Sequence, residues 1–377
     1  MITFSSLIHS IYFFFFGFFI RRNYDVIFYY PNHFNRGSDF ENEYFKLLIK
    51  SCSENNLSYL LIEEPSLINP IRRNKNAIPF DVVYIFIVLL RKIMPVNNGF
   101  HKREHRIGRI IKKIFFRNIK LDNLITISQS MISIFRGISF QSKIFDLQHG
   151  VIYKNKHNYI LNGSVNNNLS INKVFLLLFG AGFKDLLIRN DYSNFFKKNC
   201  IVIGQSIRPN IIHSEFNKNI LVTLQFTIDH DNKINLKLKN DLIKFIKKSP
   251  KSYNFYLKHH PRFNNEVELD EIINLTNVKF ISGSVLTCLK ICSMHVTAYS
   301  TTIFEAALLG IPSVAYSDFK FKNHFINEFN YPITKNISDY EDKILYQLDS
   351  KILTEWSSNF FEFYNANKFI KAIKNES

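Results

Sequence analysis

Cysteine is scarce in this chain of 377 residues, which contains only four. Cys288 and Cys292 are spaced i, i+4 on a predicted helix, and no second CxxC or Cys/His cluster has the spacing of a zinc site. The sequence therefore predicts no disulfide framework and no metal site, and it favours a reducing compartment. The length predicts two domains of ordinary size with cores large enough to fold without such cross-links.

Long apolar runs are also missing. Residues 7–20 form a run of 14 residues with four consecutive phenylalanines, whereas a transmembrane helix needs about 20. Arg21 and Arg22 follow this run and no positive charge precedes it, which is the wrong order for a secretory signal. We interpret residues 1–22 as a hydrophobic segment that is either buried or lies in the membrane interface, and we favour the interface.

Acidic residues are outnumbered, with 31 Asp and Glu against 48 Lys and Arg and a formal charge of +17. Part of this excess reflects a general abundance of Lys, Asn, Ile and Phe, so local clusters carry more weight. Residues 101–117 contain seven Lys or Arg and one acid, Glu104, with isoleucines at helical spacing on another face. This pattern is typical of a helix at a membrane surface and equally of a solvated surface helix. Aromatic residues are not interleaved with the cations, so we expect no nucleic-acid partner.

Strands and helices alternate from residue 24 onward, which predicts an α/β protein with parallel sheets covered on both faces. One alternating series ends at Gln205 and a second follows an irregular segment. We therefore predict an acceptor-side domain at residues 1–205 and a donor-binding domain at 206–377. A terminal helix, within residues 351–373, is expected to pack back across the junction.

The segment VTAYSTTIFEAALLGIPSVAY, residues 296–316, predicts a strand that leads through a hydroxyl-rich turn into a helix ending near Gly310. Ser300, Thr301 and Thr302 offer hydroxyls at the start of that helix, where free amides and the helix dipole favour an anion such as phosphate.

A second polar strand end, YNFYLKHHPR at residues 253–262, carries Lys258, His260 and Arg262. Open α/β sheets bind ligands at the carboxyl ends of their strands, so both strand ends are expected to serve one donor phosphate site.

In the first half, the predicted strand KIFDLQHG ends with Gln148, His149 and Gly150. The glycine permits a sharp exit from the strand. A neutral histidine near pH 7 accepts a proton, so His149 is a candidate general base. Gln148 and Gly150 beside it, and Arg36 after an earlier strand, are candidate acceptor-side residues by position.

In their order along the chain, LQHG, KHHP and STTIFEAALLGIP resemble motifs of bacterial GT-B glycosyltransferases that build surface polysaccharides. The resemblance covers most of the chain after Tyr24. It includes capsule and lipooligosaccharide transferases, sialyl and polysialyl transferases, and the polyol-phosphate transferases of teichoic acid synthesis. It implies two Rossmann-like domains with an interdomain cleft. It assigns His149 as the base, His260 as a donor phosphate ligand, Ser300 with Thr301 as the hydroxyl pair, and Glu305 as the acid that holds donor hydroxyls. Trp is absent before His149, and the acidic DDG-type motif of polysialyl transferases is missing.

These features predict a transferase that moves a sugar from a nucleotide-sugar co-substrate to a surface polysaccharide or lipid-linked glycan, with inversion and without metal or other cofactor. We expect it at the inner face of the cytoplasmic membrane, in peripheral contact. The Asp229, His230 and Asp231 triplet resembles a metal-binding DxD motif, but it precedes a predicted helix, where Asp is a favourable cap.

Three alternatives remain open. A CDP-polyol phosphotransferase would use the same two histidines but attack phosphorus. A nucleotide-sugar 2-epimerase would share the fold and the helix-start site, yet it needs an acidic catalytic pair that the sequence does not identify. A basic membrane-binding protein without enzymatic activity would explain the charge and the basic helix.

Overall fold

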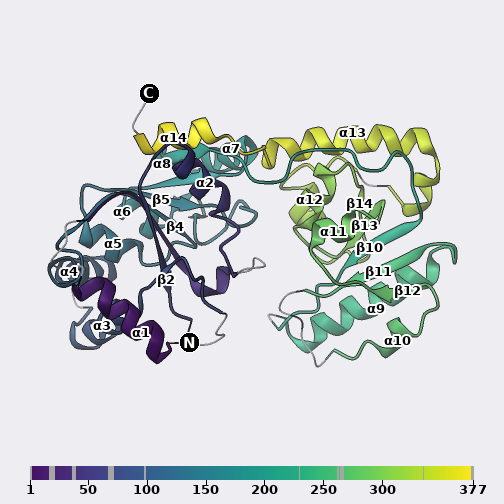
Figure 1. The fold of residues 1–377 in the computed structure, drawn as a ribbon. Coiled ribbons are helices and arrows are strands. Elements are labelled where there is room, and N and C mark those ends of the chain that lie inside the picture. Colours follow the sequence, from purple (N-terminus) through teal and green to yellow (C-terminus); the bar gives the residue numbers. More distant parts are fainter. Residues whose placement is uncertain are drawn as a thin grey trace. The chain divides into compact units, whose positions relative to one another are not determined.

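The computed structural model describes residues 2–16, 22–35, 40–66, 72–96, 99–228, 230–260, 263, 267–333 and 335–374. The chain forms two compact units (Figure 1). Unit 1 comprises Met1–Gly204 together with Tyr364–Ser377, and unit 2 comprises Gln205–Phe363. The chain thus crosses between units close to the predicted boundary at residue 205, and its last segment returns to unit 1.

Unit 1 is built on a parallel sheet that has seven strands among the described residues, in the order β3-β2-β1-β4-β5-β8-β9. The chain builds one side of the sheet with β1, β2 and β3 and then crosses to β4 on the other side of β1. The carboxyl ends of β1 and β4 therefore form the topological switch point, the usual ligand position in such sheets. The strands are β1 (Arg22–Pro31), β2 (Tyr59–Glu64), β3 (Ile78–Pro79), β4 (Ile119–Ile127), β5 (Lys143–Leu147), β8 (Val174–Leu178) and β9 (Cys200–Val202), with a separate hairpin of β6 (Ile160–Leu161) and β7 (Ser164–Val165).

Helices of unit 1 surround this sheet (Figure 1). The apolar run at residues 80–90 is helical in α3, and the first described α-helix after β1 begins at Lys46. The helices are α1 (Phe4–Ile11), α2 (Lys46–Glu54), α3 (Asp81–Ile93), α4 (Phe100–Ile114), α5 (Ile132–Ile138), α6 (Asn167–Ile171), α7 (Ala181–Asn190), α8 (Phe195–Asn199) and α14 (Ala366–Lys374).

The basic segment predicted at residues 101–117 is α4, and its two faces have different surroundings. Ile107 and Ile111 are fully buried. Gly108 lies against α5 so closely that an added Cβ would come within 2.2 Å of the Ile134 carbonyl oxygen. The opposite face exposes cations to solvent, as the amphipathic pattern predicts.

Unit 2 repeats the arrangement with five described strands in the order β12-β11-β10-β13-β14, all parallel. Its switch point lies between β10 and β13. The strands are β10 (Asn219–Thr223), β11 (Asn254–Lys258), β12 (Val278–Phe280), β13 (Met294–Thr297) and β14 (Ser313–Ala315), and the α-helices are α9 (Asn232–Lys248), α10 (Asp270–Ile273), α11 (Val285–Leu289), α12 (Thr302–Leu308) and α13 (Lys343–Phe360).

The single helix predicted within residues 351–373 is two helices, α13 and α14, with Phe361 ending α13 in a non-helical conformation. α14 packs on unit 1, where Phe369 and Ile373 join the core cluster that contains Phe28 and Phe45. The backbone amide of Asn365 donates to the carbonyl of Ile203, which holds the returning chain beside β9. The apolar pattern of α14 therefore serves the core of unit 1.

The hydrophobic amino-terminal segment is partly buried. It forms α1 and a π-helical turn, Tyr12–Phe16. Phe14 is buried among Phe80, Phe115 and Phe116, whereas Phe4 is 81% exposed. No helix in the described part of the chain is long and apolar enough to cross a membrane.

Candidate functional site

His149 lies just beyond the carboxyl end of β5 in unit 1. Its ring is half-buried and meets the ring of Phe34 edge-on, with centroids 5.6 Å apart. The hydroxyl of Tyr44 donates a 3.2 Å hydrogen bond to its carbonyl oxygen. Both neighbours follow β1, so His149 stands on the sheet edge that contains the switch point.

Gln148 and Gly150, the predicted acceptor-side neighbours of His149, have different surroundings. The Gln148 side chain is buried, accepts from the amide of Phe179 at 2.8 Å and donates to the Gly150 carbonyl at 2.8 Å. This amide therefore ties the end of β5 to the end of β8. An added Cβ at Gly150 would lie 4.0 Å from Nζ of Lys156, an ordinary contact, and Gly150 is not among the glycines with positive φ, so its backbone does not require glycine. Arg36 lies outside the described residues.

Two further carboxylic acids lie on this edge, the partly buried Glu64 and the buried Asp146, and neither was predicted from the sequence. Glu64, at the end of β2, accepts from the hydroxyls of Tyr29 at 2.8 Å and Ser130 at 2.5 Å. Asp146, on β5, accepts from the backbone amide of Gln129 at 2.9 Å. Consecutive residues of the loop after β4 thus contact both acids. The signal in the sequence was an acid at the end of each apolar strand.

Burial controls the protonation of these acids. It raises the pKa of Asp146 to about 7, and the Oδ2 atom has no hydrogen-bond partner among the described residues. Burial also raises the pKa of Glu64. Lys156 is affected in the opposite sense, since burial lowers its pKa to about 8. Acids that are poised to exchange protons near neutral pH are common at catalytic sites.

Replacing Asp146 with asparagine is expected to change how the stability of the protein depends on pH. Unfolded Asp146 ionises near its ordinary pKa of 3.8, whereas the folded group holds its proton up to about pH 7. Between these values the unfolded state binds fewer protons, so wild-type stability falls as pH rises, by up to a few kcal/mol. Urea unfolding from pH 4 to 8 should show a smaller fall in Asp146→Asn. The exposed Asp122→Asn variant is the control. Parallel profiles of wild type and Asp146→Asn would contradict the assignment.

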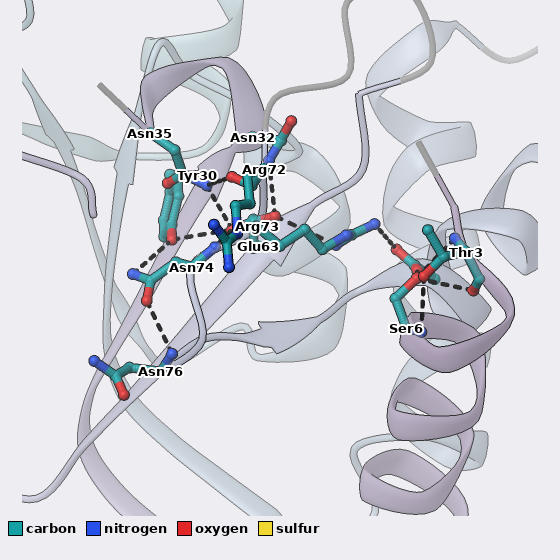
Figure 2. Close-up of polar contacts among 11 residues, drawn as sticks. Thr3, Ser6, Tyr30, Asn32, Asn35, Glu63, Arg72, Arg73, Asn74 and Asn76 are labelled. Atoms are coloured by element: carbon teal, nitrogen blue, oxygen red, sulfur yellow. Dashed lines mark hydrogen bonds and ion pairs between the residues drawn. The ribbon is translucent and has the colours of Figure 1, made fainter. Parts of the chain in front are cut away.

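A second network fixes the neighbouring part of the edge, and Glu63 is its centre (Figure 2). This carboxylate is buried and accepts from the side-chain amides of Asn32 at 3.0 Å and Asn35 at 2.8 Å, and from the backbone amide of Asn74 at 3.0 Å. Arg73 pairs with it at 3.4 Å. The network joins the ends of β1 and β2 to the segment that follows Arg72, and these contacts serve the scaffold.

In unit 2, the predicted hydroxyl turn lies between β13 and α12, as the sequence indicated. Ser300 caps the helix, since its Oγ accepts from the amide of Thr302 at 3.3 Å and donates to the Thr302 hydroxyl at 3.0 Å. Thr301 is the N-cap residue by position, but its side chain makes no capping bond. Gly310 follows the helix with φ of +70°, which confirms the predicted glycine end.

Glu305 lies in the first turn of α12 and has a buried carboxyl oxygen. Its Oε2 atom is buried and has no hydrogen-bond partner in the described part of the chain. Burial raises the pKa of this carboxyl to about 7. An oxygen in this state loses the free energy of hydration without compensation, unless a ligand supplies a donor.

The other predicted donor-site residues lie at or just beyond the carboxyl end of β11. His260 follows β11 and is half-buried. The Lys258 ammonium donates to the carbonyl of Gly283, so this side chain is held by the loop after β12. His259, beside them, stacks on Phe280 with ring centroids 4.5 Å apart. Arg262 lies outside the described residues.

A contact near this switch point that the sequence did not predict joins Tyr299 and His230. The Tyr299 hydroxyl is hydrogen-bonded to Nε2 of His230. The neighbouring Asp231 caps α9, because its carboxylate accepts from the amide of Ile234 at 2.8 Å, which confirms the capping interpretation. Asp229 lies outside the described residues, and the described residues contain no cluster of potential metal ligands.

Comparison with known proteins supports the fold. A scan against protein-family models and a search of curated proteins each found no match. Among solved structures, the chain is similar to a UDP-GlcNAc 2-epimerase from Neisseria meningitidis bound to UDP-GlcNAc, with TM-score 0.51 and 12% identity over 93% of this chain and 100% of the other. It is also similar to MnaA of S. aureus, solved with UDP, with TM-score 0.51 and 9% identity over 93% and 95% of the two chains. The lipopolysaccharide outer core galactosyltransferase WaaB gives TM-score 0.49 and 11% identity over 93% and 100%. The two parallel sheets and the likenesses to the two structures with TM-score 0.51 give the chain the GT-B fold, with two Rossmann-like domains.

Proposed function

We propose that this protein is a glycosyltransferase that moves a sugar from a nucleotide-sugar donor to a surface polysaccharide or lipid-linked glycan, in peripheral contact with the cytoplasmic face of the membrane. The observation that carries the proposal is the buried Oε2 atom of Glu305 beside the Ser300 turn, which has no hydrogen-bond partner within the part of the chain that the structure describes. Its position matches the acid that holds donor hydroxyls in the transferases that the motifs resemble. A sugar hydroxyl would supply the donor that Oε2 lacks.

The proposed mechanism assigns one task to each unit. In unit 2, His260 and the hydroxyls of Ser300 and Thr301 bind the donor phosphates and stabilise the charge that develops on the leaving nucleotide. In unit 1, His149 takes the proton of the acceptor hydroxyl as that oxygen attacks the anomeric carbon. Attack from the face opposite the nucleotide inverts the anomeric centre. These donors are sufficient for charge stabilisation, so the proposal requires no metal.

Donor binding can be tested by thermal shift with CMP, CDP, UDP and GDP sugars, because a ligand that binds only the native state raises the melting temperature. We expect one nucleotide class to stabilise the wild type and His259→Ala, the matched control. His260→Ala and Glu305→Ala should lose most of this shift, since each removes a proposed contact with the nucleotide sugar. Equal shifts for wild type, His260→Ala and Glu305→Ala would contradict the donor site.

One observation favours a second candidate, a nucleotide-sugar 2-epimerase. The partly buried Glu64 and the buried Asp146 supply two carboxylic acids near the switch point of unit 1, contacting Ser130 and Gln129 respectively. Such a pair is the acidic chemistry that an epimerase requires and that the sequence did not identify. The two functions differ in their need for an acceptor. An epimerised nucleotide sugar formed without acceptor would support the epimerase, whereas acceptor-dependent release of nucleotide would support the transferase.

A further inference from the structure

A cavity of about 490 Å³ opens between α1 and the segment around Arg73 in unit 1. Its lining is basic and rich in hydroxyls, and no acidic residue of the described segments lines it. The lining includes Thr3, Ser5, His9, Arg72, Arg73 and Lys75. Such a lining is suited to an anion with several acceptor oxygens, and a phosphate has this chemistry.

The wall of this cavity is held in place by buried acids (Figure 2). Arg73 donates to Asp81 at 2.5 Å and pairs with Glu63 at 3.4 Å, so its charge is largely balanced. The Ser6 hydroxyl donates to the same Asp81 at 2.6 Å and fixes the start of α1. Arg72 and Lys75, by contrast, are exposed, and neither forms an ion pair with any described residue. These two cations supply the net positive charge of the cavity.

The same helix presents an apolar face to solvent. Phe4, Ile8 and Ile11 recur at i, i+4 and i+7 and are exposed, with Phe4 at 81% and Ile8 at 50%. The cavity residues Ser5 and His9 lie one position further along, on the adjacent face of α1. Because 100° separates successive residues of a helix, the basic cavity and the apolar stripe are neighbours on one helix.

A second apolar stripe lies on α3, which packs against α1 (Figure 1). Ile85, Leu89 and Ile93 recur at i, i+4 and i+8 and are exposed, Ile93 at 75%. Large apolar side chains gathered on packed helices mark an interaction surface more often than scattered ones do. Exposed cations of α4, which packs on α3, extend the positive charge.

We propose that this cavity binds the phosphate of an anionic membrane lipid, whose acyl chains lie against the apolar stripes of α1 and α3. The pairing of a cationic cavity with an apolar face matches the amphipathic chemistry of a phospholipid, whereas a soluble phosphate would use only the cavity. This site deepens the membrane contact proposed above and does not depend on sugar transfer. The cavity lies on the β2 and β3 side of the sheet, next to the Glu63 network.

Vesicle sedimentation of the full chain tests this site. We expect binding to phosphatidylcholine vesicles that contain phosphatidylglycerol and much weaker binding to phosphatidylcholine alone. The exposed pair Arg72→Gln/Lys75→Gln should bind the anionic vesicles about tenfold or more weakly, since each cation near an anionic surface contributes substantially to binding. The control is Lys233→Gln/Lys251→Gln, which removes the same charge from exposed positions of unit 2 and should bind nearly as wild type does.

Two further variants separate the parts of the site. Phe4→Ser/Ile8→Ser keeps every cation and should also lose vesicle binding, because the acyl contact is removed. Ser5→Glu adds a negative charge to the lining and should weaken binding to anionic vesicles. Circular dichroism and sugar-nucleotide thermal shifts check that each variant folds.

Inorganic phosphate, added in the same assays, distinguishes a lipid headgroup from free phosphate as the ligand of the cavity. A thermal shift with inorganic phosphate that Arg72→Gln/Lys75→Gln abolishes, together with vesicle binding that no unit 1 variant changes, would overturn the lipid assignment. Equal vesicle binding by the cavity pair and the charge control would overturn it as well. Loss of nucleotide binding with intact vesicle binding would count only against the donor site.

Discussion

Replacing His149 with glutamine is expected to lower the turnover of sugar transfer by about 10²–10⁴-fold, the usual contribution of a positioned general base. The change removes the proton acceptor and retains a side chain of similar size beside Phe34. His149 belongs to unit 1 and the proposed donor contacts belong to unit 2. The nucleotide-sugar thermal shift should therefore remain.

Steady-state kinetics with the stabilising donor and saturating acceptor would measure this effect. The matched control is His157→Gln, an exposed histidine eight residues further along the same strand connection. Turnover within about threefold of wild type would remove His149 from the mechanism.

The largest effect on stability is expected for Phe304→Ala, at about 3–5 kcal/mol. Phe304 is fully buried in α12 and stacks on Trp356 of α13, with ring centroids 5.0 Å apart. Phe329 and Phe361 each lie 5.3 Å from it. Removing the ring leaves a cavity that these rigid neighbours cannot fill. Because Phe304 precedes Glu305, the loss also loosens the helix turn that carries the unpaired carboxylate.

Fluorescence makes this result measurable in unit 2, because Trp356 is the only tryptophan of the chain. Urea unfolding followed at this residue should show a lower midpoint for Phe304→Ala and an intermediate one for Phe304→Leu. Phe140→Ala, which removes a ring that is 79% exposed, should change stability by less than about 0.5 kcal/mol. A loss below about 1 kcal/mol for Phe304→Ala would show that the aromatic cluster does not hold α12.

Local signals in the sequence predicted the strands that carry the site. The apolar runs before His149, Lys258 and Ser300 are strands, and the glycine and proline after residue 309 end α12 as expected. Asp231 caps α9 because a short acid before an apolar helical pattern is a local feature. These features depend on neighbours within a few residues, so periodicity and capping chemistry reveal them.

Long-range packing decided what the sequence analysis left open or missed. Helical pattern alone did not show that the end of the chain divides into α13 and α14, with α14 in the core of unit 1. The order of strands brings the loop after β4 to both Glu64 and Asp146, which are 82 residues apart in the sequence. No motif connects them.

The sequence by itself determined the class of fold and the polar residues at the strand ends, because alternating apolar segments and turn chemistry are written in consecutive residues. Only the tertiary structure decided which acids are buried, which cations remain exposed beside α1 and which carboxyl oxygens lack a partner among the described residues. Burial and hydrogen bonding depend on segments that meet through folding, and the pKa values near 7 of Asp146 and Glu305 follow from that burial.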